Sequence, residues 1–114
     1  MTMAQKENTI TSSVKNGIEN RIEIFNQKHL TKSNCKYYAD IKGKFIYLMR
    51  NSVYIPAEKV CRLSYNGDLN KMDFAIYKYS TEKYDPNEIF FPGIKYVNGT
   101  LEGAMLAGLE AYPI

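Results

Sequence analysis

The apolar positions between Ser13 and His29 repeat with the period of an α-helix. They recur every three or four residues and form one stripe, made of Val14, Ile18, Ile22 and Phe25. Charged residues occupy most of the positions between them, so we expect this helix to bury one face and expose the other. Ser12 or Ser13 is a suitable cap, because a hydroxyl oxygen accepts a hydrogen bond from a free N–H of the first turn.

After residue 34 the period of the pattern changes to 2, which is typical of β-strands. Four segments have strand character, at residues 35–42, 45–50, 59–65 and 72–79. The segment 45–50, FIYLMR, is apolar at successive positions and predicts a central strand. Gly43 and the pair Asn66–Gly67 tolerate left-handed backbone, so both positions predict tight turns between antiparallel strands.

The C-terminal segment TLEGAMLAGLEAYPI predicts a second helix, capped by Thr100 and ended by Pro113. Gly103 and Gly108 each cost a helix about 1 kcal/mol relative to alanine. Close packing is the usual compensation, either against the protein's own sheet or against another copy of the chain. The preceding residues 80–99 have no clear period, and the apolar run Ile89–Phe91 predicts a short strand or helical turn that covers part of the core.

The order of these elements predicts an α+β fold. It consists of an N-terminal helix, a four-stranded antiparallel sheet and a C-terminal helix, with both helices on one face of the sheet. Residues 12–114 are expected to form this single domain, and the polar residues 1–11 a disordered N-terminal tail.

Composition and charge narrow the class of protein. The chain has 114 residues, of which 45% are hydrophobic and 24% charged, as in ordinary globular domains. No secretory signal or transmembrane run is present in the sequence, which predicts a cytoplasmic protein without membrane contact. Residues 1–63 contain eleven Lys/Arg and five Asp/Glu, whereas residues 64–114 contain four and seven. This polarised charge could attract an acidic partner or align two like chains head to tail.

Few residues suggest catalytic chemistry. His29 is the single histidine, and Cys35 and Cys61 lack the spacing of a metal or redox motif, so we expect no metal and no cofactor. Both thiols are expected to be buried. The acidic residues between Asp68 and Glu88 fall in turn-like segments, where carboxylates usually face water, and no catalytic residue is assigned.

Tyrosine is the unusual residue of this chain, with ten copies. With both helices on one face, the other face of the sheet is open, and we expect tyrosines to gather there. We therefore predict a non-catalytic module that binds another protein or forms a homodimer. The candidate interaction residues are Tyr38, Tyr47, Tyr77, Tyr79, Lys42, Lys44, Arg50, Gly103 and Gly108.

Two alternative functions follow from other features. Basic and aromatic side chains alternate along the first two strands, as they do on surfaces that stack nucleic-acid bases, so a nucleic-acid-binding domain is one alternative. The second is a small-molecule-binding domain or an enzyme, with a site near residues 73–96 beneath the apolar loop.

Overall fold

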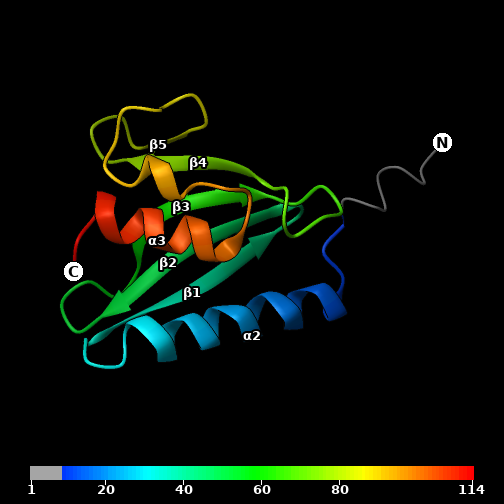
Figure 1. Ribbon diagram of the computed structural model, residues 1–114, viewed down its shortest axis with the longest axis horizontal. Coiled ribbons are helices and arrows are strands. Elements are labelled where there is room, and N and C mark those ends of the chain that lie inside the picture. The colour runs from blue at the N-terminus through cyan, green and yellow to red at the C-terminus, as the bar shows by residue number, and fades with distance from the viewer. Residues whose placement is uncertain (1–8) are drawn as a thin grey trace.

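The computed structural model describes residues 9–114, which form the predicted α+β fold (Figure 1). A long helix comes first, a sheet of five antiparallel strands follows, and a shorter helix ends the chain. The elements are α2 (Ser12–His29), β1 (Cys35–Lys42), β2 (Phe45–Ser52), β3 (Glu58–Ser64), β4 (Asp73–Lys78), β5 (Lys83–Asp85), the 3₁₀ turn η1 (Ile94–Tyr96) and α3 (Leu101–Ala111). The predicted tail, residues 1–11, lies mostly outside the described residues.

Helix α2 has the predicted extent and buries the predicted stripe. Ile18, Ile22 and Phe25 are buried. The cap is one residue earlier than expected, because the Thr11 hydroxyl accepts the hydrogen bond from the Val14 N–H at 3.2 Å.

The sheet is a meander in which each strand pairs with the next one along the chain, in the order β1-β2-β3-β4-β5. The ladder between β2 and β3 contains one irregularity. Leu48 pairs with Cys61 and Met49 pairs with Lys59, so Val60 is an extra residue in β3. Such a β-bulge lets two successive side chains face the same way. Val60 and Cys61 are accordingly both fully buried.

Both helices cover the same face of the sheet, and the core lies between them and the strands (Figure 1). Tyr37 is central to this core, with 2% of its surface exposed. Its ring packs edge-on against Phe25 of α2, and its hydroxyl donates to the Met105 carbonyl of α3 at 2.8 Å. Because Cys35 and Cys61 lie on β1 and β3, with β2 between them, these two buried thiols are free.

Helix α3 packs closely because two of its residues lack side chains. A Cβ atom on Gly108 would lie 2.5 Å from Val60 Cγ1, and closer still to the Tyr37 hydroxyl. A Cβ on Gly103 would overlap the Tyr96 carbonyl and the Asn98 side chain. The cost of these glycines to helix stability is therefore offset by close packing within the domain. Both glycines are buried in the core, so they are not surface positions for contact with another chain.

The segment between β4 and α3 differs from the prediction. The run Ile89–Phe91 was expected to cover part of the core, but Ile89 and Phe90 are 59% and 88% exposed, and only Phe91 packs against the core. The strand of this segment is Lys83–Asp85 and its helical turn is Ile94–Tyr96, whereas residues 88–91 have no regular structure. The connection between β3 and β4 is also longer than a two-residue hairpin. It spans residues 65–72, and the Asn66 amide donates to the Lys71 carbonyl at 2.7 Å.

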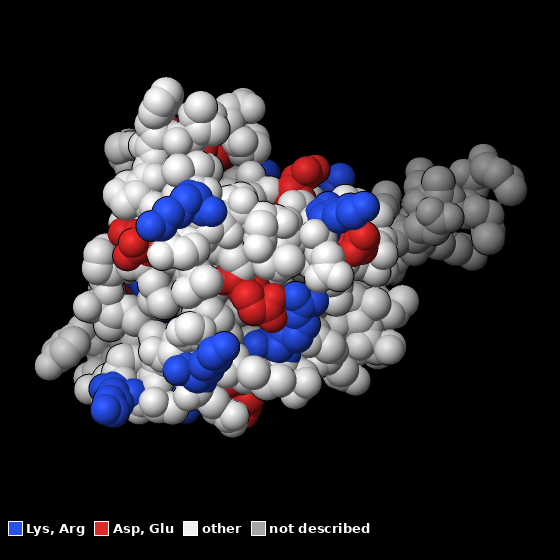
Figure 2. All heavy atoms as spheres, viewed as in Figure 1, with Lys and Arg blue, Asp and Glu red and all other residues white. Residues whose placement is uncertain are grey.

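No helix among residues 9–114 is long and apolar enough to cross a membrane. On the helix-bearing face, Lys and Arg side chains alternate with Asp and Glu, without a large patch of one sign (Figure 2).

Candidate functional site

The side of the sheet opposite the helices forms a surface of aromatic and basic residues, here called the helix-free face. Strand alternation and register place the following residues on it: Lys36, Tyr38, Asp40 and Lys42 of β1; Phe45, Tyr47, Met49 and Asn51 of β2; Lys59, Arg62 and Ser64 of β3; Asp73, Ala75 and Tyr77 of β4; and Tyr84 of β5. This surface contains four of the nine predicted interaction residues, Tyr38, Lys42, Tyr47 and Tyr77.

Arg62 lies at the centre of this face, between two aromatic rings. Its guanidinium carbon is 4.7 Å from the ring centroid of Phe45 and 5.6 Å from that of Tyr84. A cation held over aromatic faces is attracted by the negative potential of the rings. Among residues 9–114, Arg62 forms no ion pair, and its Nε atom is buried without a hydrogen-bond partner.

The tyrosines around Arg62 support one another through edge-to-face contacts. The ring centroid of Tyr84 lies 5.3 Å from that of Tyr47 and 4.9 Å from that of Tyr77. Tyr77 itself is only 5% exposed, so it is a buried residue of this face against which the Tyr84 ring packs. Burial raises the pKa of the Tyr84 hydroxyl well above its ordinary value, so this hydroxyl remains a donor at neutral pH.

Lysine side chains cover further aromatic rings on this side of the sheet. Lys42 lies 5.9 Å from the centroid of Tyr47, and Lys59 lies 5.2 Å from that of Tyr77. Lys44, in the β1–β2 turn, lies 5.5 Å from the centroid of Phe45. Three exposed lysines thus lie beside the aromatic rings of this side of the sheet.

Two other predicted tyrosines lie nearer the edges of this surface. Tyr38 of β1 is 37% exposed, and Tyr79 follows β4 and is 49% exposed. The Tyr79 hydroxyl donates to the Lys59 carbonyl at 2.6 Å, and its ring packs edge-on against Tyr77 and Tyr112. The contacts of Tyr79 therefore fix it at the boundary of the helix-free face.

Arg50 does not lie with these residues, although we expected it to interleave with the tyrosines. It is 1% exposed and points to the helix-bearing side, where its Nη2 is 2.8 Å from Glu58 Oε1. The physical reason is strand parity, because Arg50 shares the face of Ile46 and Leu48. Arg50 is therefore a core residue paired with a carboxylate.

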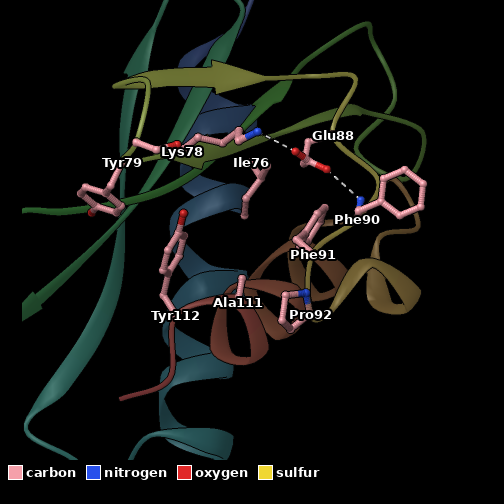
Figure 3. Close-up of a pocket in the computed structure, with 10 residues that line it drawn as sticks. Ile76, Lys78, Tyr79, Glu88, Phe90, Phe91, Pro92, Ala111 and Tyr112 are labelled. Carbon is pink, nitrogen blue, oxygen red and sulfur yellow. Dashed lines mark hydrogen bonds and ion pairs between the residues drawn. The ribbon is translucent and has the colours of Figure 1, made fainter.

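The predicted region near residues 73–96 contains a pocket of about 340 Å³ between β4, the loop before η1 and the end of α3 (Figure 3). Its charged groups are already paired. Lys78 Nζ donates to Glu88 Oε1 at 2.6 Å, and Glu88 Oε2 accepts from the Phe90 N–H at 2.9 Å. These hydrogen bonds raise the pKa of Lys78 and lower that of Glu88. Both groups therefore stay charged at neutral pH, which does not suit proton transfer.

His29 and Cys61 pack against other residues of the domain. The imidazole of His29 lies 4.4 Å from the Phe25 ring, and burial raises the pKa of the Cys61 thiol, which disfavours the reactive thiolate. Within residues 9–114, no group of three His, Cys, Asp or Glu side chains is placed to hold a metal ion.

The sequence reasoning missed Arg62 and Tyr84 as site residues. The signal for Arg62 was present, since it alternates with the buried Cys61 and Leu63. Tyr84 had no such signal, because its strand is only three residues long.

Comparison of the chain with protein-family models, curated proteins and solved structures found no significant match. The fold and site define a small α+β domain with an exposed aromatic and basic sheet surface.

Proposed function

We propose that this chain is a non-catalytic protein-interaction module, which binds an acidic partner through its helix-free face. The observation that carries the proposal is Arg62, a cation fixed between Phe45 and Tyr84 without a carboxylate partner among the described residues. A guanidinium binds a carboxylate through two parallel hydrogen bonds. Arg and Tyr are also the residue types that contribute most strongly to protein–protein binding.

The charges of this face support an acidic partner over a second copy of the chain. Lys36, Lys42, Lys59 and Arg62 point to this side, against Asp40 and Asp73. Two copies joined face to face would bring these cations near each other, which disfavours a homodimer through this surface. An acidic protein segment would neutralise them.

Nucleic-acid binding is the second candidate, because phosphates would also pair with these cations. Single-stranded binding additionally requires bare aromatic faces on which bases stack. Here Arg62 lies over Phe45 and Tyr84, and lysines lie over Tyr47 and Tyr77. Cations thus lie near four of the aromatic rings of this face, which favours a protein partner.

The two thiols add support for the predicted cytoplasmic location. Cys35 and Cys61 are free and buried on strands that are not neighbours. Unpaired cysteines of this kind suit a reducing compartment.

The proposal can be tested by selecting binders from a displayed library of random peptides. We expect the selected peptides to be enriched in Asp and Glu, and their affinity to fall about tenfold in Arg62→Met, which corresponds to about 1.4 kcal/mol. Methionine retains apolar bulk between the two rings but removes the guanidinium. Lys15→Met, on the exposed surface of α2, is the matched control and should bind normally.

Two results would contradict this function. One is a peptide set without acidic enrichment, or with equal affinity for Arg62→Met and the parent protein. The other is tight binding of a single-stranded oligothymidylate that weakens steeply with salt, which would favour the nucleic-acid alternative. Light scattering after size exclusion tests for self-association independently of these binding experiments, since a stable dimer would appear without any ligand.

A further inference from the structure

Strand β1 is an outer strand of the sheet, and α2 runs along it (Figure 1). In an antiparallel pair, alternate residues direct their N–H and C=O groups away from the neighbouring strand. Tyr37 is such a residue, because its backbone groups bond to α2 and not to β2. By the same alternation, Cys35, Ala39 and Ile41 also direct their backbone groups outward.

The first part of this edge is closed by side chains. The Asn26 amide of α2 imitates a neighbouring peptide group: its Nδ2 donates to the Tyr37 carbonyl and its Oδ1 accepts from the Tyr37 N–H, both at 2.9 Å. The Ser33 hydroxyl accepts from the Cys35 N–H at 3.3 Å. The Asn26 contact shows that an amide group from outside the sheet can pair with this edge of β1.

The second part of the edge is open. Among residues 9–114, no group bonds the outward N–H and C=O of Ala39 and Ile41. Unpaired groups on an outer strand are a template for an additional strand. An extended peptide residue opposite each position would form up to four backbone hydrogen bonds.

A groove lies between this open edge and α2. It measures about 240 Å³, and it is lined by Glu19, Ile22, Glu23, Asn26, Tyr37, Tyr38 and Ala39. The carboxylates of Glu19 and Glu23 are one helical turn apart, and neither forms an ion pair with a described residue. Like charges at this spacing repel each other, so a cation beside them would be favourable.

We propose that this groove binds an extended peptide segment of another protein that carries a basic side chain. The segment adds to the sheet at Ala39 and Ile41, a recognised mode of peptide binding. Side chains alternate along an added strand, so those on the helix side would bring Lys or Arg to Glu19 and Glu23. A second copy of the chain fits less well, because pairing β1 with β1 would bring the same carboxylates of two α2 helices together.

The first experiment measures amide hydrogen exchange and ¹⁵N chemical shifts of the free protein. The Tyr37 amide should be protected by Asn26, whereas the Ala39 and Ile41 amides should exchange at least about tenfold faster. Slow exchange at Ala39 and Ile41 in the free protein would overturn the proposal, because the edge would already be occupied.

The second experiment is a titration with acetyl-Thr-Lys-Thr-Lys-Thr-amide. We expect dissociation constants near 1 mM for so short a probe, with the Ala39 and Ile41 amides shifting and becoming protected. A version with Glu in place of Lys, and a version methylated on alternate backbone nitrogens, should each bind about tenfold more weakly.

Variants of the protein connect the binding to the acidic side of the groove. Glu19→Gln combined with Glu23→Gln should weaken the lysine peptide about fivefold or more, because both carboxylates are lost. Glu110→Gln, an exposed carboxylate on α3, should leave binding unchanged. Three results would overturn the proposal. The glutamate or methylated peptide could bind as tightly as the lysine peptide, or the chemical-shift changes could be confined to residues other than Ala39 and Ile41. The third is no binding at peptide concentrations several times the expected dissociation constant.

Discussion

Replacing Gly108 by alanine is expected to destabilise this protein, although the same change stabilises most helices. The new Cβ would lie 2.5 Å from Val60 Cγ1 and even closer to the Tyr37 hydroxyl. Neither neighbour has room to move, because Val60 is fully buried and Tyr37 is held by its hydrogen bond to the Met105 carbonyl. The helix must therefore shift outward, or the hydrogen bond must break.

The size of the effect follows from two opposing contributions. Replacing a glycine by alanine in a helix interior raises the free energy of unfolding by about 1 kcal/mol. Overpacking a core costs about 1–3 kcal/mol, and leaving the Met105 carbonyl without its donor adds about 1 kcal/mol. We expect Gly108→Ala to lose about 1–3 kcal/mol of unfolding free energy, measured by urea denaturation with circular dichroism.

Gly17→Ala in α2 is the matched control, because a Cβ there would meet no atom within 4 Å. It should gain up to about 1 kcal/mol. Combining Gly108→Ala with Val60→Ala should restore part of the loss, with a coupling energy of at least about 0.5 kcal/mol. If Gly108→Ala stabilises the protein as much as Gly17→Ala does, the close approach of α3 to β3 is incorrect.

Three further predictions concern buried and paired groups. Glu58→Ala leaves Arg50 buried without its carboxylate and should cost about 3–5 kcal/mol in urea denaturation, whereas a loss below about 1 kcal/mol would mean that water reaches Arg50. The Cys61 thiol should react with a thiol reagent only as fast as the protein unfolds, and labelling that outpaces unfolding would contradict its burial. The hydrogen bond from Arg21 lowers the pKa of Glu102, so its contribution to stability is complete above the ordinary value of 4.5 and is lost as pH falls through the lowered folded-state pKa. The difference in urea midpoint between the parent protein and Glu102→Gln should therefore shrink between about pH 7 and pH 3, and a difference that persists at the lower pH would contradict this contribution.

Long periodic segments of the sequence were sufficient to predict most of the fold. Helix α2 and strands β1 to β4 each show a pattern over at least six residues, and Thr100 marks the start of α3 as predicted. The strand Lys83–Asp85 was missed because three residues are too short to establish a period. Its pairing with β4 depends on tertiary contacts, which a local pattern does not contain.

The candidate site was partly predictable for a similar reason. Alternation along β1 and β2 placed Tyr38, Lys42 and Tyr47 together on the helix-free face, as the structure shows. The same alternation would have placed Arg50 with Ile46 and Leu48, but its charge suggested solvent exposure. Its burial depends on Glu58 from another strand, and that pairing is visible only once the register is known.

The extra residue in β3 also determines which charges meet inside the protein. With the bulge at Val60, Arg50 pairs with Glu58. In an uninterrupted ladder continuing from Leu48 and Cys61, Arg50 would instead face Lys59, and two cations would meet at this rung. The misaligned ladder is thus penalised by electrostatic repulsion, while the observed one is favoured by an ion pair. Exchanging Glu58 and Lys59 in the sequence would reverse this preference, so the order of two adjacent residues helps the sheet to assemble in a single alignment.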